Sequence, residues 1–134
     1  MSTEKPALRK PVFEKVSALE PGKRGYNLIV KVGDTRVVLE RTRTDGSKLK
    51  ISEAVVGDAS GSILLTCRND QIDTVSKGST IVLRNCKVEM FKNHMRLAVD
   101  KWGLIEPSKT PLNEEINTKE NLSETEYELV DESH

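Results

Sequence analysis

A chain of 134 residues is long enough for one domain with one hydrophobic core. Aromatic residues make up only 4% of it and charged residues 31%, so we expect an aliphatic core, which suits short Val, Ile and Leu strands better than large packed helices. No stretch has the apolar length of a membrane span or of a signal-peptide core, so we expect a soluble, intracellular protein with no membrane partner.

The formal net charge of zero conceals two oppositely charged regions. Residues 1–110 contain 20 Lys and Arg against 13 Asp and Glu, whereas residues 111–134 contain one Lys and eight carboxylates. The chain is therefore a basic body followed by an acidic segment. Residues 108–134 offer too little apolar surface to bury, and their composition predicts an acidic, disordered, solvated tail.

The N-terminal residues 1–11 carry two prolines and four charges without an apolar period, which predicts a disordered lead-in. We expect order to begin near Val12. The apolar residues that follow, up to the Pro21-Gly22 stop, have helix-like or turn-like spacing and are expected to cover one end of the fold.

The run over residues 27–44 is long for one strand. Gly33-Asp34 inside it predicts a bulge that bends the strand sharply, and Asp45-Gly46 is a hairpin-turn signal. In the returning strand Lys48 and Lys50 alternate with aliphatic residues, so we expect both lysines on the face opposite the core.

Two runs rich in β-branched residues, 51–56 and 63–66, are separated by Gly57-Asp58-Ala59-Ser60-Gly61, a pattern typical of a β-hairpin. The two glycines are expected to supply positive φ at low cost. Asp58 and Ser60 are expected to hydrogen-bond their own backbone in the tight turn.

Residues 62–68 alternate as a third strand, and residues 69–79 interrupt the pattern as a short helix or turn. The strand pattern then resumes and changes parity near Asn85-Cys86, which predicts a kink before a tight turn and a last strand. This order predicts an all-β fold over residues 12–107. The expected architecture is a five-stranded barrel of the oligonucleotide/oligosaccharide-binding (OB) type, with a short helix between strands three and four.

The two cysteines, Cys67 and Cys86, lie in strands that are not neighbours in such a barrel. We therefore predict two buried free thiols in a reducing compartment rather than a disulfide. The cysteines and the two histidines have no zinc-ligand spacing, so we expect no metal and no other cofactor.

Several short segments carry a family resemblance through their order and spacing: Leu19-Glu20-Pro21-Gly22, Asn27-Leu28-Ile29-Val30, Gly57-Asp58 to Gly61-Ser62-Ile63, Gly78-Ser79-Thr80-Ile81-Val82-Leu83, and Phe91-Lys92. On these residues the chain resembles the small single-OB-fold proteins of the SOSS single-stranded-DNA sensor complex and their archaeal single-stranded-DNA-binding relatives. The whole sequence looks most like a small plant OB-fold protein of this group.

The resemblance implies that bases stack on groove aromatics while basic residues follow the nucleic-acid backbone. It further implies single-stranded DNA as the ligand, a role in DNA repair, and a nuclear or cytoplasmic location. Of the four groove positions that the family implies as aromatic, only Phe91 is aromatic here. Arg68, Lys87 and Ala98 occupy the other three.

The candidate binding residues are one aromatic and eight basic side chains on the inferred groove face and its rims: Phe91, Arg68, Lys87, Arg96, Arg41, Arg43, Lys48, Lys50 and Lys92. Phe91 is the leading candidate, because an exposed aromatic on a barrel face is costly unless it is used. Arg68 and Arg96 are predicted to stack on bases through their guanidinium planes, and Lys87 to contact phosphate. The cations beside the first hairpin turn are expected to form one rim of the groove, and Lys92 the other.

Two further expectations concern the edges of the fold. Trp102 is interpreted as packing against the barrel edge in preference to serving as a base platform. The opposite charges of body and tail predict that the acidic tail competes with nucleic acid for the basic face.

The sequence lacks a P-loop, a GxGxxG loop, an HExxH motif and a nucleophile elbow, so we expect no catalytic residues. The main alternative is a protein-interaction module that joins a larger complex through the barrel edge or through the tail motif Tyr127-Glu128-Leu129-Val130. RNA is a second possible ligand, because nothing in the sequence identifies a contact to the 2′-hydroxyl.

Overall fold

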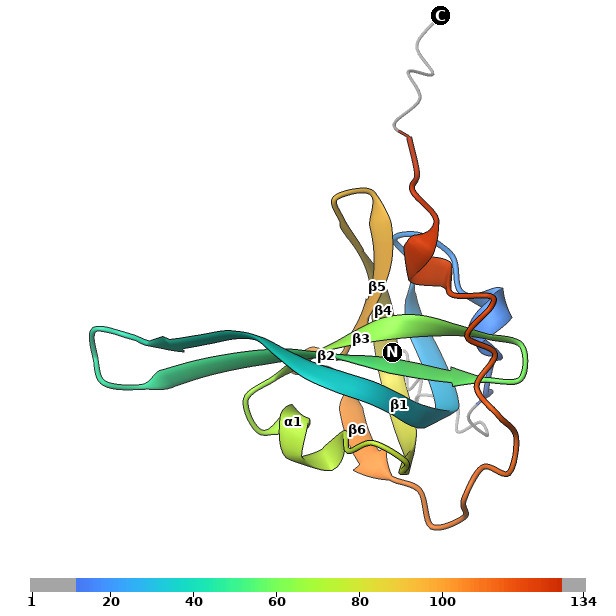
Figure 1. Cartoon of the computed structure of the whole chain (residues 1–134), viewed down its shortest axis with the longest axis horizontal. Coiled ribbons are helices and arrows are strands. Elements are labelled where there is room, and N and C mark those ends of the chain that lie inside the picture. Colours follow the sequence, from blue (N-terminus) through green and yellow to red (C-terminus); the bar gives the residue numbers. More distant parts are fainter. Residues whose placement is uncertain (1–11, 129–134) are drawn as a thin grey trace, which may run out of the picture.

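The computed structural model describes residues 12–128, in which the strands form one closed sheet (Figure 1). The lead-in over residues 1–11 and the end of the predicted tail motif, Leu129-Val130, lie outside the described residues. The elements in chain order are η1 (Val16–Ala18), β1 (Arg24–Thr42), β2 (Lys48–Asp58), β3 (Gly61–Arg68), α1 (Gln71–Thr74), β4 (Thr80–Phe91), β5 (His94–Ala98), β6 (Leu104–Pro107) and η2 (Leu122–Glu124).

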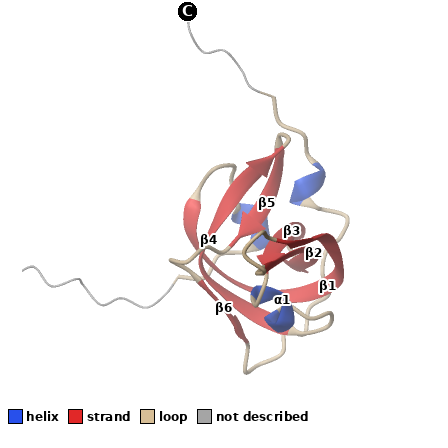
Figure 2. Cartoon of the chain, turned by 90° about the vertical axis from the view of Figure 1, so that its left-hand side faces the viewer, coloured by secondary structure: helices blue, strands red, loops and turns tan. Residues whose placement is uncertain are grey.

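The first five strands close into a ring because β1 pairs antiparallel with both β2 and β4, while β3 pairs parallel with β5. Figure 2 looks along the projecting β1–β2 hairpin and shows the strands ringing the core. This confirms the predicted five-stranded OB barrel with a short helix, α1, between β3 and β4. One further strand, β6, pairs with the first part of β4, from Ile81 to Arg84.

The bend in β1 allows one strand to serve both sides of the barrel. Its register shifts between Val32 and Thr35, so the predicted bulge at Gly33-Asp34 is confirmed. A second shift, between Val37 and Leu39, precedes the stretch in which β1 and β2 leave the barrel together. These two strands project as a long hairpin, called the arm here, with its turn at residues 43–47 (Figure 1).

The core is aliphatic, as predicted, and includes both cysteines. Cys67 and Cys86 are free and buried, and β3 and β4 are not paired with each other. Burial raises the pKa of the Cys67 thiol to about 11 and that of Cys86 to about 12. Both thiols are therefore protonated and unreactive at neutral pH.

The β2–β3 hairpin forms where predicted, and Asp58 makes the expected bond to the backbone of the turn. The Ser60 hydroxyl does not: it accepts from the Ser17 amide at 3.0 Å and donates to Asp58. Asp58 accepts a hydrogen bond from the Ser60 amide at 2.8 Å and another from the Val16 amide at 3.1 Å, which ties η1 to the turn. The expected positive φ at the two glycines is wrong, since neither has one. Glycine is needed at Gly57 for space: a Cβ there would collide with the Gly61 carbonyl oxygen and lie 2.8 Å from Ile116.

The kink in β4 lies at the predicted place. Asn85 adopts a φ of 52°, and the β1–β4 register shifts beside it. Beyond the kink Val88 points inward and the alternate residues point outward. Lys92 and Asn93 both have positive φ and form the tight turn into β5, so Phe91 ends its strand at the tip of this hairpin.

Residues 108–128, called the strap here, differ from the predicted solvated tail because they lie against the barrel. β3 and β5 pair at only two positions, and the strap bonds to both strands beside that short pairing. The Ser62 amide donates to the Glu120 carbonyl at 2.9 Å, and the Tyr127 amide to the Asn93 carbonyl at 2.8 Å. The hydroxyl of buried Ser123 accepts from the Leu64 amide at 3.0 Å.

The prediction of a solvated tail was wrong for residues 108–128 because it considered only the apolar surface available for burial. Main-chain hydrogen bonds to neighbouring strands satisfy polar groups without needing a large apolar face. No helix within residues 12–128 has the length and apolar character needed to cross a membrane.

Candidate nucleic-acid interface

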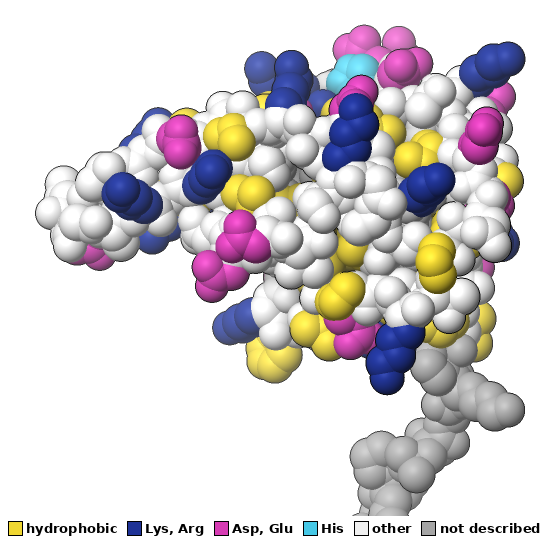
Figure 3. All heavy atoms as spheres, turned by 60° about the horizontal axis from the view of Figure 1, so that its bottom comes forward, with side chains coloured by type: hydrophobic (Ala, Val, Ile, Leu, Met, Phe, Trp, Pro, Cys, Tyr) yellow, Lys and Arg dark blue, Asp and Glu magenta, His cyan; other side chains and the backbone are white. Residues whose placement is uncertain are grey.

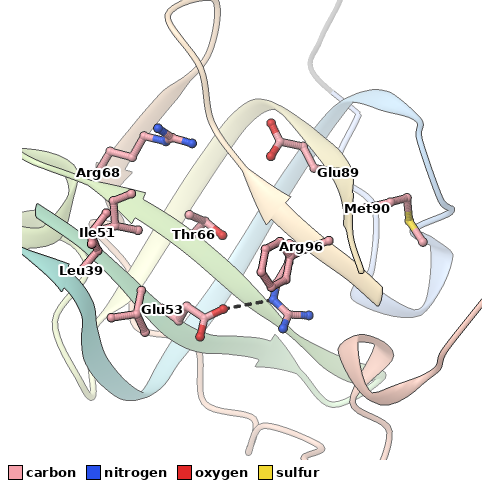
Figure 4. Close-up of a pocket in the computed structure, with 10 residues that line it drawn as sticks. Leu39, Ile51, Glu53, Thr66, Arg68, Glu89, Met90 and Arg96 are labelled. Carbon is pink, nitrogen blue, oxygen red and sulfur yellow. Dashed lines mark hydrogen bonds and ion pairs between the residues drawn. The ribbon is translucent and has the colours of Figure 1, made fainter. Parts of the chain in front are cut away.

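A groove of about 310 Å³ lies on the outer face of the sheet, between the base of the arm and the β4–β5 hairpin (Figure 4). Its floor is apolar and its polar lining combines two arginines with two glutamates. The lining residues are Val38, Leu39, Ile51, Glu53, Thr66, Arg68, Glu89, Met90, Phe91 and Arg96.

Phe91 is the aromatic of this groove, and its side chain is 53% exposed. The Lys92 Nζ lies 5.4 Å from the centroid of the ring, and the Arg96 guanidinium carbon lies 5.6 Å from it. Cations at such distances are attracted by the negative face of the ring. The predicted position of Phe91 on the open groove face is therefore the one found, with two positive charges beside it.

Arg96 is fixed inside the groove by an ion pair. Its Nε donates to Glu53 Oε2 at 3.1 Å, and the other oxygen of Glu53 accepts from Arg36 at 3.4 Å. The Arg96 side chain is only 17% exposed. It is thus held over the Phe91 ring by Glu53 and is less available to phosphate. Figure 4 shows the ion pair of Arg96 with Glu53.

Arg68 ends β3 on the groove face, directly across from Ile51. Its side chain is exposed, and its guanidinium makes no ion pair within residues 12–128. Among the arginines that line the groove, Arg68 is therefore the one whose charge and planar face are available to a ligand.

Lys87 lies in the same outer row of β4 as Phe91, directly across from Ala98. Its Nζ is 3.0 Å from Glu89 and 3.4 Å from Asp100, and the bond to Glu89 raises the pKa of the lysine. Two carboxylates already balance this charge. The structure thus places Lys87 beside the groove but does not leave it as the open phosphate contact that the sequence predicts.

The cations of the arm separate onto two faces. β2 pairs with β3 without a register shift, and Ile51 and Glu53 face the groove while Ser52 faces the core. Strict alternation then places Lys48 and Lys50 on the side of the arm that continues the core-facing row. The face expected for the two lysines is wrong, because Leu49 and Ile51, the aliphatic residues that alternate with them, belong to the groove face.

The arginines of the arm share the groove face. Arg41 lies directly across from Leu49, whose parity is that of Ile51, and Arg43 follows two residues later. Both side chains are exposed, and basic side chains are visible along the arm in Figure 3. The predicted rim is therefore formed by Arg41 and Arg43, and Lys92 is exposed at the opposite rim, on the β4–β5 turn.

The sequence did not identify several residues that line the groove. They are the apolar residues Leu39, Ile51 and Met90 and the largely buried carboxylate Glu53. The sequence does contain a signal for the two faces of this strand. Ser52, Ala54 and Val56, at even positions, are small or branched and are buried, so the odd positions face outward. The interpretation of Trp102 as a packed residue is also wrong, because its side chain is 72% exposed. Within residues 12–128 no three His, Cys, Asp or Glu side chains gather as metal ligands.

Known proteins are similar to this chain in sequence and in fold. A family model described as single-stranded DNA binding protein Ssb-like, OB fold, matches residues 19–107. An uncharacterized Arabidopsis thaliana protein is 44% identical over 131 residues, 91% of this chain and 85% of that protein. The single-stranded DNA binding protein Ssb of Saccharolobus solfataricus is 28% identical over 109 residues, 81% of this chain and 73% of that protein.

A solved structure extends the likeness to the whole fold. The solution structure of a hypothetical protein from Arabidopsis thaliana superimposes with a TM-score of 0.76 at 40% identity. The match covers 100% of this chain and 98% of that one, so it includes the strap as well as the barrel.

Proposed function

Because the chain belongs to the Ssb-like OB-fold family of single-stranded-DNA-binding proteins, we propose that it binds single-stranded nucleic acid, and in the first place DNA, without catalysing a reaction. The ligand lies in the groove between the arm and the β4–β5 hairpin. The archaeal relative named as a single-stranded DNA binding protein supports DNA as the ligand.

The observation that carries the proposal is the exposed ring of Phe91 at an apolar groove with two cations beside it. A base stacks on an aromatic ring through its π-face, and each such contact contributes about 1–3 kcal/mol. The aliphatic floor accepts the flat apolar surface of the base. Arg68, which has no carboxylate partner within residues 12–128, supplies a second planar contact or binds a phosphate.

The rims of the groove supply the phosphate attraction. The groove lining itself is charge-balanced, with Arg68 and Arg96 opposing Glu53 and Glu89. Exposed Arg41 and Arg43 on one side and Lys92 on the other therefore provide the net positive charge along the backbone path. Binding that depends on such exposed cations weakens steeply as salt rises.

The test is a fluorescence-anisotropy titration of the full chain with labelled mixed-sequence DNA and RNA single strands, at low and moderate salt. We expect salt-sensitive binding with DNA favoured. Phe91→Leu, which keeps an apolar side chain but removes the ring, should weaken binding about 5- to 100-fold, and Phe91→Tyr should retain most of it. RNA preference would reassign the ligand. No binding at low salt would overturn the proposal in favour of a protein-interaction module.

The finer expectations rest on the family resemblance alone: membership of a SOSS-like complex, a role in DNA repair, and residence in the nucleus or cytoplasm. Isolation of the tagged full chain from nuclear and cytoplasmic fractions tests its location. Identification of its stable partners tests membership of the complex and, through the known roles of those partners, the role in DNA repair. A chain recovered without partners would count against the complex.

A further inference from the structure

Trp102 has an open side chain on a fixed backbone. Its side chain is 72% exposed, yet its amide donates to Asp100 Oδ1 at 2.9 Å and its carbonyl accepts from Asn85 Nδ2 at 2.9 Å. The next residue, Gly103, also donates to the Asp100 carbonyl at 3.0 Å and lies so close to Arg84 that a Cβ would sit 2.6 Å from its carbonyl oxygen. The loop thus holds a large aromatic ring in water in a defined place.

The surroundings of this ring are positively charged. The Lys101 Nζ lies 5.0 Å from the centroid of the Trp102 ring. The neighbouring carboxylate of Asp100 is shared by two cations, Arg24 at 3.3 Å and Lys87 at 3.4 Å. Lys87 also pairs with Glu89, so the cations left open near the ring are Lys101, beside the indole, and Arg24, whose side chain is 69% exposed. Positive charge next to an open aromatic plane is the combination that single-stranded nucleic acid recognises.

The loop is continuous with the groove along the outer face of β4 and β5. Phe91, Glu89 and Lys87 point outward from alternate positions of β4, and Ala98 lies across from Lys87. Four residues of strand span about 13 Å, so Lys87 lies about that far from Phe91. Lys87 in turn pairs with Asp100, and Asp100 accepts the hydrogen bond from the Trp102 amide. Ala98, across from Lys87, adds only a methyl group to this face.

We propose that Trp102 is a second stacking platform, on which a single strand that leaves the Phe91 groove past Lys87 and Ala98 places a further base. This inference rests on the proposed function and extends its site. It gives the chain an aromatic contact outside the four groove positions, three of which lack an aromatic side chain. The ligand is a single strand long enough to reach from one ring to the other.

The chain's single tryptophan makes the test direct, because stacking of a base on the indole quenches its emission. The full chain is titrated with unlabelled DNA single strands of about 3 and about 15 nucleotides, the shorter below and the longer within known OB-fold site sizes, while tryptophan emission is recorded. Binding is followed in parallel by the anisotropy of labelled strands. We expect the long strand to quench the emission and the short strand to bind in the groove without quenching it.

Two variants separate this contact from the groove. Trp102→Leu should remove the extra affinity of the long strand, about 5- to 100-fold, and leave the short strand unchanged. Trp102→Phe should retain most of that extra affinity. Phe91→Leu should weaken binding of both lengths. Because the Trp102 side chain is exposed, we expect the thermal midpoint of Trp102→Leu to match that of the unaltered chain.

The outcomes distinguish the two proposals. Strands that bind by anisotropy but leave emission unchanged, with Trp102→Leu binding both lengths normally, would overturn the second platform and leave the groove intact. Equal weakening of both lengths by Trp102→Leu would also overturn it. The absence of binding by the unaltered chain would overturn the proposed function, and would leave the exposed ring as a contact for a protein.

Discussion

The groove and the strap differ in what holds their side chains in place. Side-chain ion pairs organise the groove: Glu53 holds Arg96, and Glu89 and Asp100 hold Lys87. The strap is the more acidic segment, yet within residues 12–128 its only ion pair joins Glu114 to Lys15. Hydrogen bonds from neighbouring main-chain groups and from the Ser123 hydroxyl hold it instead.

This difference shows that the net charge of a segment predicts neither how the groove is organised nor how the strap is held. The groove belongs to the basic part of the chain, but its inner cations are largely balanced and the unbalanced ones stand at its rims. Of the strap's carboxylates, Glu114 accepts from the Ala59 amide at 2.9 Å and the others are exposed, while its few apolar side chains and its backbone meet the barrel. Attraction of a polyanion is thus expected from the rims, and repulsion from the outer side of the strap.

The largest effect is expected from loss of the strap's buried hydroxyl. Ser123→Ala leaves the Leu64 amide and the Met95 carbonyl, which it contacts at 3.0 and 2.6 Å, without partners. Two buried unpaired groups should lower the free energy of unfolding by about 2–4 kcal/mol, measured by urea denaturation. Thr118→Ala, at a strap position away from the β3–β5 pairing, is the matched control and should change it little. Equal stability of both variants would mean that the strap adds nothing to the fold.

The two faces of the arm provide the next test. Arg41→Gln with Arg43→Gln removes two charges from the groove face, and Lys48→Gln with Lys50→Gln removes two from the other face. The arginine pair should weaken single-strand binding about five- to tenfold at low salt and reduce the slope of log affinity against log salt by about 1.4. The lysine pair should leave the slope unchanged. Equal effects would show that the arm acts as a diffuse charge without a binding face.

The strap's carboxylates are expected to have a smaller effect of opposite sign. The backbone of Glu126 forms an isolated antiparallel β-bridge with His94 beside the β4–β5 turn, and Glu124 precedes it by two residues. Changing both to Gln should tighten single-strand binding about two- to fivefold at low salt and not at high salt. Glu115→Gln with Glu120→Gln is the control for charge elsewhere in the strap. Unchanged affinity would remove the predicted competition between acidic segment and ligand.

The smallest effect is expected at Lys87. Glu89 and Asp100 already neutralise it, so Lys87→Gln should change single-strand affinity less than about twofold. Arg68→Gln removes an unpaired groove cation and should weaken binding about three- to tenfold in the same anisotropy titration. A larger loss at Lys87 than at Arg68 would mean that the ligand displaces its carboxylate partners.

Much of the fold could be predicted from the sequence because its signals are local. Alternation marked the strands, Gly33-Asp34 the bulge, and the residues around Asn85 the kink. Separation of Cys67 and Cys86 on unpaired strands followed from the barrel order. For the site, the position of Phe91 at a strand end beside a tight turn was equally local, and so was Lys92 on the turn itself.

Only the tertiary structure decided which face of each strand lies toward the core and which cations are left unpaired for a ligand. Alternation defines two faces of β2, but only pairing with β3 puts Ser52 in the core and Lys48 on the side away from the groove. Glu53 and Arg96 are 43 residues apart, and Ser123 lies 28 residues from Met95. Such partners meet only when the barrel closes, because local sequence fixes the backbone pattern whereas charge balance and burial depend on distant residues.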